Sequence, residues 1–353
     1  MNFPASNNLP INLLSACFNR TTSTYKYYWF LAILQSLENG RSNIPKIEIF
    51  SRMIANSWYT VNYFNISFGK QDLIQKAILS INQSEKIPIN EKKEVVFNRI
   101  YESNNRITYN TLWHFNKNVP HWFLSPWFPK FKSETDSIRQ NRIYNESKKF
   151  TNKCLYALYK DYLIINDSWI EYLVSNAKFL KDFCFWNLAL FLQSKNPNVP
   201  DIPNKLIKPA RRNSLAKQKA QFWDIAIKEL GSLQCIYTGK DLTIKNYALE
   251  HFVPYSFVSH DLIWNLIPAD PSFNSSKGSR LPQIGRYFKS FYEIQKTAFE
   301  IVKKKKPKSK ILLDYLTIYD EHDFELTEQG LKKIIQPLIS IASNNGFEFM
   351  KYE

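Results

Sequence analysis

The sequence predicts a mostly α-helical protein with a small α+β unit: a helical N-terminal domain over residues 1–195, then a compact unit over residues 220–300. Only 8 glycines stand beside 26 phenylalanines, 20 tyrosines and 9 tryptophans, a balance that favours helices with bulky packing. Apolar residues recur at steps of three and four through the first half of the chain. Prolines interrupt this pattern between the two parts, and 44% hydrophobic residues suffice for sizeable cores.

The N-terminal domain is expected to consist of helices separated by polar turns. Residues Thr21–Thr24 can cap a helix that runs through YKYYWFLAILQSLEN and ends at Gly40. The last helix of the domain is expected over residues 168–193. Further helices are expected over residues 46–64, 70–84, 90–103 and 136–165. The segment VPHWFLSPWFP (119–129) is rich in proline and is expected to be an extended connector.

Residues 196–219 are expected to form a linker that is first rich in proline and then basic. Its basic part contains no acidic residue and consists of Lys205, Lys208, Arg211, Arg212, Lys217 and Lys219. A second basic run consists of Lys303–Lys306, Lys308 and Lys310. Because the two runs bracket residues 220–300, we expect Arg211, Arg212 and Lys217 to contact phosphate groups; a solvated surface is the alternative.

Residues 301–353 are expected to contain the second basic run, an acidic segment over residues 311–330 and a C-terminal helix. The acidic segment has no lysine or arginine. We interpret it as a solvated loop, with contacts to the basic surfaces or to a protein partner as alternatives.

The charge balance indicates a polyanionic partner. The chain has 47 Lys and Arg against 31 Asp and Glu, a formal net charge of +16. A basic surface that neutralises phosphates releases counterions and gains affinity without reading sequence. We therefore expect a nucleic acid, with membrane headgroups or a purely solvated basic surface as alternatives.

The cysteines and the N-terminus indicate a soluble cytoplasmic protein. The four cysteines lie far apart and form no CxxC pair, which argues against a disulfide framework and fits a reducing compartment. The first twenty residues lack the charged start and long apolar core of a signal peptide. The apolar stretch Tyr27–Leu37 is too short to span a bilayer, so no membrane partner is expected.

The segment CIYTGKDLTIKNYALEHFVPYSFVSHDLIWNLIPADPSFNSSKGSRLP, residues 235–282, contains the residues that point to chemistry. A strand is expected over Tyr247–Phe252, with Glu250 and His251 near its end. A second strand is expected over Leu262–Ile267, with Asn265 inside it.

A helix is expected to begin at Pro271 and to present three polar residues. Asn274 and Lys277 are three residues apart and therefore share one face of that helix; Arg280 follows. The order strand, loop, strand and helix is expected to bring Glu250, His251 and Asn274 within reach of one metal ion.

Here the sequence resembles the HNH (ββα-metal) endonuclease family. The stretches EHFVPYSF, WNL and FNSSKG match its pattern: an acidic residue with histidine, a central asparagine, then asparagine followed by lysine. The segment is most similar to the HNH domain of CRISPR RNA-guided DNA-cutting effectors, and CIYTGKDL resembles their Cys-x-Tyr-x-Gly-Lys opening. The whole chain resembles, more faintly, bacterial restriction and anti-phage defence proteins.

The resemblance implies a role for each residue of the motif. His251 would be the general base that takes a proton from water. Glu250 and the amide oxygen of Asn274 would hold a hard divalent cation, expected to be Mg²⁺ with Mn²⁺ as the alternative. Asn265 would brace the loop and orient the base. Lys277 is a candidate catalytic and phosphate contact, and Arg280 a further nucleic-acid contact.

Two departures from the family pattern matter. Glu250 stands where the family more often has aspartate, which changes the reach of the carboxylate. Many members of the family stabilise this unit with a zinc ion held by two CxxC pairs. Cys235 has no such partner, so no structural zinc is expected. Apolar packing is expected to hold the unit instead, from Trp264, Leu266, Phe273 and Leu281.

The sequence therefore predicts a metal-dependent endonuclease acting on DNA, with double-stranded DNA as the favoured substrate and bacterial defence or restriction as the favoured context. Two alternatives stay open. The chain could be a nuclease subunit that acts only within a larger complex with a protein partner, or a nucleic-acid-binding module without activity. The N-terminal domain would recognise DNA, receive a signal or dock a partner.

Overall fold

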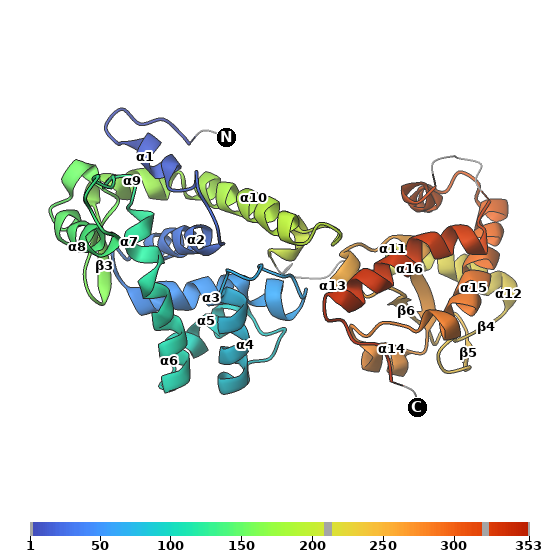
Figure 1. Ribbon diagram of the computed structural model, residues 1–353. Coiled ribbons are helices and arrows are strands. Elements are labelled where there is room, and N and C mark those ends of the chain that lie inside the picture. Colours follow the sequence, from blue (N-terminus) through green and yellow to red (C-terminus); the bar gives the residue numbers. More distant parts are fainter. Residues whose placement is uncertain (1–2, 208–213, 320–324, 352–353) are drawn as a thin grey trace. The chain divides into compact units, whose positions relative to one another are not determined.

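The computed structural model describes residues 3–207, 214–319 and 325–351, and the chain divides into two compact units (Figure 1). The first unit comprises residues 1–197 and 202–208, and the second comprises residues 198–201 and 209–353. The predicted class is confirmed: the chain is mostly helical, with the small α+β unit after a helical N-terminal part. Arg211 and Arg212 lie outside the described residues, so their predicted phosphate contacts stay predictions.

Helix α2 (Tyr25–Glu38) is the central element of the first unit. Residues 29–34 are fully buried, which is the pattern of a helix covered on all sides. Helices α3 (Lys46–Asn62) and α10 (Ala177–Lys195) pack against it, and Figure 1 shows α2 between them. The other helices are α1 (Ile11–Ala16), α4 (Ile74–Glu85), α5 (Lys93–Tyr101), α6 (Arg106–Trp113), α7 (Val119–Phe123), α8 (Asp136–Ser147) and α9 (Asp167–Ser175).

The predicted helix over residues 136–165 is wrong in its second half. Helix α8 ends at Ser147, and strands β2 (Tyr156–Leu158) and β3 (Tyr162–Ile165) follow. With β1 (Asn43–Pro45) they form an antiparallel sheet in the order β1-β3-β2. In β3, buried and half-buried residues alternate, the period of a strand, and its β-branched and aromatic side chains suit that conformation.

Three further expectations for this unit need correction. Residues 119–123 form helix α7 rather than an extended connector, because Pro120 occupies the first turn, where its missing N–H has no partner to lose. The helix over residues 168–193 is interrupted at Asn176. Thr24 precedes α2 but does not cap it, since its hydroxyl donates to Oδ2 of Asp72 over 2.7 Å.

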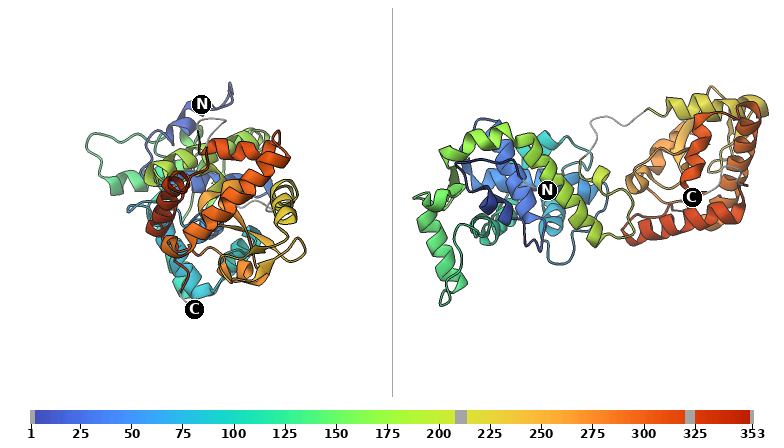
Figure 2. Two further views of the ribbon diagram at one scale, coloured as in Figure 1. Left: turned by 90° about the vertical axis from the view of Figure 1, so that its right-hand side faces the viewer. Right: turned by 90° about the horizontal axis from the view of Figure 1, so that it is seen from above.

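The second unit is built around a two-stranded antiparallel hairpin. Strand β6 (Ala248–His251) pairs with β7 (Leu266–Ala269), and helix α14 (Pro271–Lys277) packs against β6. Figure 2 shows the helices of this unit arranged around the strands. The remaining elements are α11 (Ala216–Gln218), the π-helical turn η4 (Lys219–Trp223), α12 (Asp224–Leu230), β4 (Leu233–Gln234), β5 (Asp241–Leu242), α13 (Tyr255–Val258), the 3₁₀ turns η5 (Ile263–Asn265) and η6 (Lys310–Thr317), α15 (Ile284–Lys305) and α16 (Glu328–Asn344).

Helix α15 supports the hairpin from the side of β7. Its Gln295 is fully buried, and Nε2 of that side chain donates to the backbone carbonyls of Ile263 (3.1 Å) and Leu266 (2.6 Å). The ring of Phe291 stacks on Phe252 with 4.0 Å between centroids. Apolar packing thus holds the strands in place, and the residues predicted for this role are buried or stacked: Trp264, Leu266 and Leu281 in the core and Phe273 against the ring of Tyr237.

None of the described helices is both long and apolar enough to cross a bilayer.

Candidate active site

Glu250 and His251 end strand β6. Glu250 lies opposite Ile267 of β7 and His251 lies opposite Leu266, so both residues stand at the end of the paired part of the hairpin. Both residues are buried, with 7% and 4% of their surface exposed. The strand end therefore presents a carboxylate and an imidazole in a largely water-excluded place, where electrostatic interactions are strong.

The imidazole of His251 is held by Asp261, in the loop between the two strands. Nε2 of His251 lies 2.9 Å from Oδ1 of Asp261. An ionised carboxylate only accepts hydrogen bonds, so Nε2 donates and the lone pair of the neutral ring lies on Nδ1. The loop itself is anchored by Gln218, whose Nε2 donates to the backbone carbonyl of Asp261 over 3.1 Å. Asp261 thus fixes the orientation of the His251 ring.

The side chain of Asn265 joins the end of the loop between β6 and β7 to its beginning. Its Oδ1 accepts from the backbone N–H of Val253 over 2.8 Å, and its Nδ2 donates to the carbonyl of Val253 over 2.9 Å. Asn265 is fully buried, so these bonds form away from water. The residue lies in the turn η5, just before β7, rather than inside a strand as predicted, because residues 263–265 curl into a 3₁₀ turn. Its contacts fix the chain directly after His251.

Lys277 reaches from α14 to the end of β6. Its Nζ donates to Oε1 of Glu250 over 2.6 Å and to the backbone carbonyl of His251 over 3.0 Å. Its ammonium group is fully buried, and this burial lowers the pKa of Lys277, while the charge of Glu250 opposes the change. In this state the lysine neutralises Glu250, and a phosphate contact by the same ammonium group stays a prediction.

Asn274 lies against the same strand. Its Nδ2 donates to the backbone carbonyl of Leu249, the residue before Glu250, over 3.4 Å. Asn274 and Lys277 therefore share the helix face that meets β6, as their spacing predicted. Arg280 follows the helix, and its Nε donates to the carbonyl of Lys277 over 3.1 Å. A cation at this helix end is favoured by the helix dipole.

The CIYTGK opening positions the start of α14. Asp270 caps the helix, since its Oδ1 accepts from the N–H of Ser272 over 3.1 Å. Lys240 donates to the other oxygen of Asp270 over 2.6 Å, and this hydrogen bond lowers the pKa of the carboxyl group. The backbone N–H of Asp270 in turn donates to the thiol of Cys235 over 3.4 Å. The opening thus sets where Asn274 and Lys277 lie.

The residues present fit a divalent cation that is bound largely through water. Across the described parts of the chain no three His, Cys, Asp or Glu side chains gather into a metal site. Mg²⁺ needs fewer protein ligands than that, because it keeps several waters and takes one or two carboxylates. Lys277 occupies only Oε1 of Glu250. The hydroxyl of Tyr237 is buried without a hydrogen-bond partner among the described residues, and its pKa is raised by burial and by the charge of Glu250. Such a group suits a site completed by water.

Two features of the site are not predicted by the sequence patterns: the contact of Asp261 with His251, and the pairing of Lys277 with the charge of Glu250. Asp261 is a carboxylate ten residues after His251 within the motif loop, which was the available signal, but loop conformation decides whether the two meet. Lys217, predicted to contact nucleic acid, lies exposed on α11 in the same unit. The catalytic roles predicted for Asn265, Asn274 and Lys277 stay predictions.

Comparison with known proteins agrees with this geometry. The chain matches no curated protein and no solved structure. The family model of the HNH endonucleases matches residues 235–283, the stretch that contains Glu250, His251, Asn265, Asn274 and Lys277. HNH nucleases typically use divalent metal ions. The second unit of this protein carries an HNH endonuclease domain.

Proposed function

We propose that the protein is a divalent-metal-dependent endonuclease that hydrolyses DNA phosphodiester bonds, with Mg²⁺ as the physiological ion and Mn²⁺ as a functional substitute. The observation that supports this most is the oriented pair of His251 and Asp261 at the strand end that also holds Glu250. A base, its orienting carboxylate and a metal-binding carboxylate are the parts that phosphodiester hydrolysis needs.

Each side chain has a distinct part in the reaction. His251 accepts the proton of the attacking water, while Asp261 stabilises the imidazolium that forms. Asn265 keeps the strand end and the loop in register. Glu250 and the amide oxygen of Asn274 would hold the cation, which when bound would stabilise the developing charge on the phosphate and the leaving oxygen. Lys277 supplies positive charge beside Glu250.

The test is cleavage of supercoiled plasmid by the purified full chain and by His251→Ala, each with Mg²⁺, Mn²⁺ or EDTA. The wild type is expected to cut with metal, and His251→Ala to be slower by about 10²–10⁴-fold. Asp241→Asn, at the exposed residue of β5 in the same unit, is the control and should cut normally. Equal activity in His251→Ala and wild type would exclude this site as the source of cleavage.

We propose bacterial restriction or anti-phage defence as the biological context, on the fainter resemblance of the whole chain to such proteins. Phage plating on cells with the wild type or with His251→Ala tests it, since only the wild type should reduce plaque number. A wild type that cuts no DNA alone but does so after co-purification with a second protein would instead identify a subunit of a larger complex.

A further inference from the structure

The second unit contains a basic cleft that the active-site motif does not use. The cleft has a volume of about 640 Å³ and lies between α11 and the turn that follows α15. None of the described residues that line it is acidic. Its lining residues are Lys217, Gln221, Lys306, Pro307, Lys308, Ser309 and Lys310. All four lysines are exposed.

The fold concentrates this charge from two distant stretches of sequence. Packing of α12 against α15 brings Lys217 beside the turn that contains Lys306, Lys308 and Lys310. That turn is closed by a 2.9 Å hydrogen bond from the N–H of Ser309 to the carbonyl of Lys306. Throughout the described ranges none of these four lysines forms an ion pair, whereas the neighbouring Lys305 pairs with Glu229. A second hollow at the same turn, about 190 Å³ in volume, shares Lys308 and Lys310 with the cleft and adds Lys303, and its described lining residues include no acid.

Two elements that contribute cleft lysines, α11 and η6, are hydrogen-bonded to the segment between strands β6 and β7. Gln218, next to Lys217, donates to the backbone carbonyl of Asp261, the partner of His251. In η6, which begins at Lys310 but whose Asp314 does not line the cleft, Oδ2 of Asp314 accepts from the N–H of Ile263 over 3.0 Å. Burial raises the pKa of the Asp314 carboxyl, and the nearby charge of Lys217 opposes that change. A ligand held in the cleft is thus held by the elements that position His251.

We infer that this cleft, lined by Lys217, Lys306, Lys308 and Lys310, binds the sugar–phosphate backbone of the DNA next to the cleavage site. The inference rests on the proposed function for the identity of the polyanion. Lysines act as mobile point charges on flexible stems, which suits a repeating phosphate chain read without regard to base sequence.

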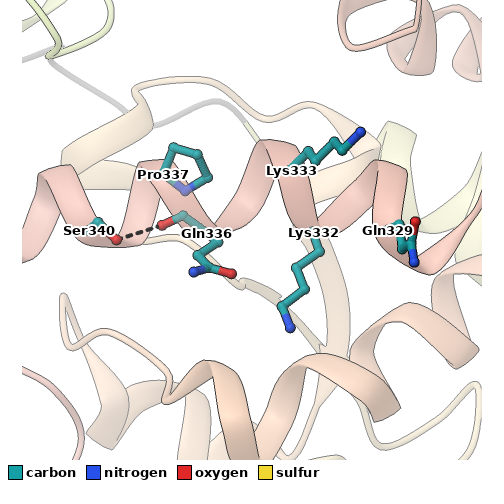
Figure 3. Close-up of a pocket in the computed structure, with 6 residues that line it drawn as sticks. All are labelled: Gln329, Lys332, Lys333, Gln336, Pro337 and Ser340. Atoms are coloured by element: carbon teal, nitrogen blue, oxygen red, sulfur yellow. Dashed lines mark hydrogen bonds between the residues drawn. The ribbon is translucent and has the colours of Figure 1, made fainter.

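The test compares two double variants of the full chain, both in a His251→Ala background and in EDTA so that the DNA stays intact. Lys306→Glu with Lys308→Glu alters the cleft. Lys332→Glu with Lys333→Glu is the charge-matched control on α16, where both lysines are exposed and line a separate hollow (Figure 3). Binding of a short labelled DNA duplex is measured by anisotropy between about 50 and 200 mM salt.

The cleft variant is expected to bind more weakly and to lose about 0.9 from the slope of log K against log salt for each phosphate contact removed. The α16 variant should keep the wild-type slope. An equal loss of DNA affinity in both variants would overturn the inference, because only net charge would then matter. Unchanged DNA affinity in both variants would also overturn it, because DNA would then not use the cleft. Loss of binding to anionic phospholipid vesicles but not to DNA would also overturn it and identify a membrane surface instead.

Failure of this inference is distinguishable from failure of the nuclease proposal. If the wild type cuts DNA with metal and the cleft variant binds DNA as well as the wild type, the cleft is not the DNA-binding site and the nuclease proposal stands. If the cleft variant binds more weakly but the wild type cuts DNA with none of the metals, the nuclease proposal fails and the DNA-binding cleft stands.

Discussion

The imidazole of His251 donates from Nε2 to the carboxylate of Asp261 over 2.9 Å, and the two residues come from a strand and from the loop that follows it. The bond selects the tautomer of the candidate base. It also couples the chemistry to a loop whose position depends on Gln218 and on Asn265.

The first prediction concerns Asp261 as a positioning residue. Asp261→Asn is expected to lower kcat by about ten- to a hundredfold, as loss of an orienting partner does at comparable sites, because the amide does not stabilise imidazolium. The duplex Kd measured in EDTA should not change. Asp261→Glu should restore part of kcat. If Asp261→Asn weakened Kd and left kcat intact, Asp261 would be a substrate contact instead.

The second prediction concerns the buried ion pair of Lys277 and Glu250. Lys277→Met removes one partner and leaves a buried carboxylate, so the free energy of unfolding in EDTA should fall by about 3–5 kcal/mol. Urea denaturation measures this loss. Adding Mg²⁺ or Mn²⁺ should recover part of it, because a cation at Glu250 replaces the missing charge.

The double variant Lys277→Met with Glu250→Leu provides the control for this pair. With both charges gone it should be more stable than Lys277→Met alone and should not respond to the cation. A cation effect that persists in the double variant would place the metal elsewhere.

The third prediction concerns Asn265. Asn265→Ala leaves the buried N–H and carbonyl of Val253 without partners, and should reduce the free energy of unfolding by about 2–4 kcal/mol. Asn265→Asp keeps an acceptor for the N–H but buries an unpaired carboxylate with one oxygen against the carbonyl of Val253, so at neutral pH it should be less stable than Asn265→Ala. Thermal unfolding of the three proteins should give that order; equal Tm values for Asn265→Ala and the wild type would refute the bracing role.

The fourth prediction concerns the cap of α14. Asp270→Asn keeps a capping oxygen but loses the ion pair with Lys240, and Asp270→Ala loses both, so Tm should fall from wild type to asparagine to alanine. The folded pKa of Asp270 lies below its unfolded value near 3.9. The advantage of aspartate over asparagine is therefore present above about pH 4 and is lost as the pH falls through the folded pKa. A difference that persisted at lower pH would contradict the charge-based explanation.

Local sequence patterns were sufficient for much of the motif. The order of β6, β7 and α14 follows from short apolar runs and from Pro271 at the start of the helix, and a three-residue step correctly put Asn274 and Lys277 on one face. The sequence pattern does not predict which of these side chains are buried. The ammonium group of Lys277 is buried because α14 lies directly on β6, and no feature of FNSSKG distinguishes that position from an exposed one.

Elsewhere, tertiary context overrode local preference. The stretch 156–165 follows a helix and contains residues compatible with one, but it pairs with β1, more than a hundred residues earlier in the chain. The contact between His251 and Asp261 likewise depends on the path of a loop, which period and propensity do not encode. Such long-range pairings are the part of the structure that a single sequence leaves open.

The buried lysine beside Glu250 has a consequence for how the enzyme is stored and switched. Because Lys277 already compensates the carboxylate, the domain needs no ion to complete its folding, in contrast to small domains that assemble around a metal. Under the proposed function, metal supply would then act on a domain that is already folded, so removal and return of the cation would stop and restore cleavage without refolding.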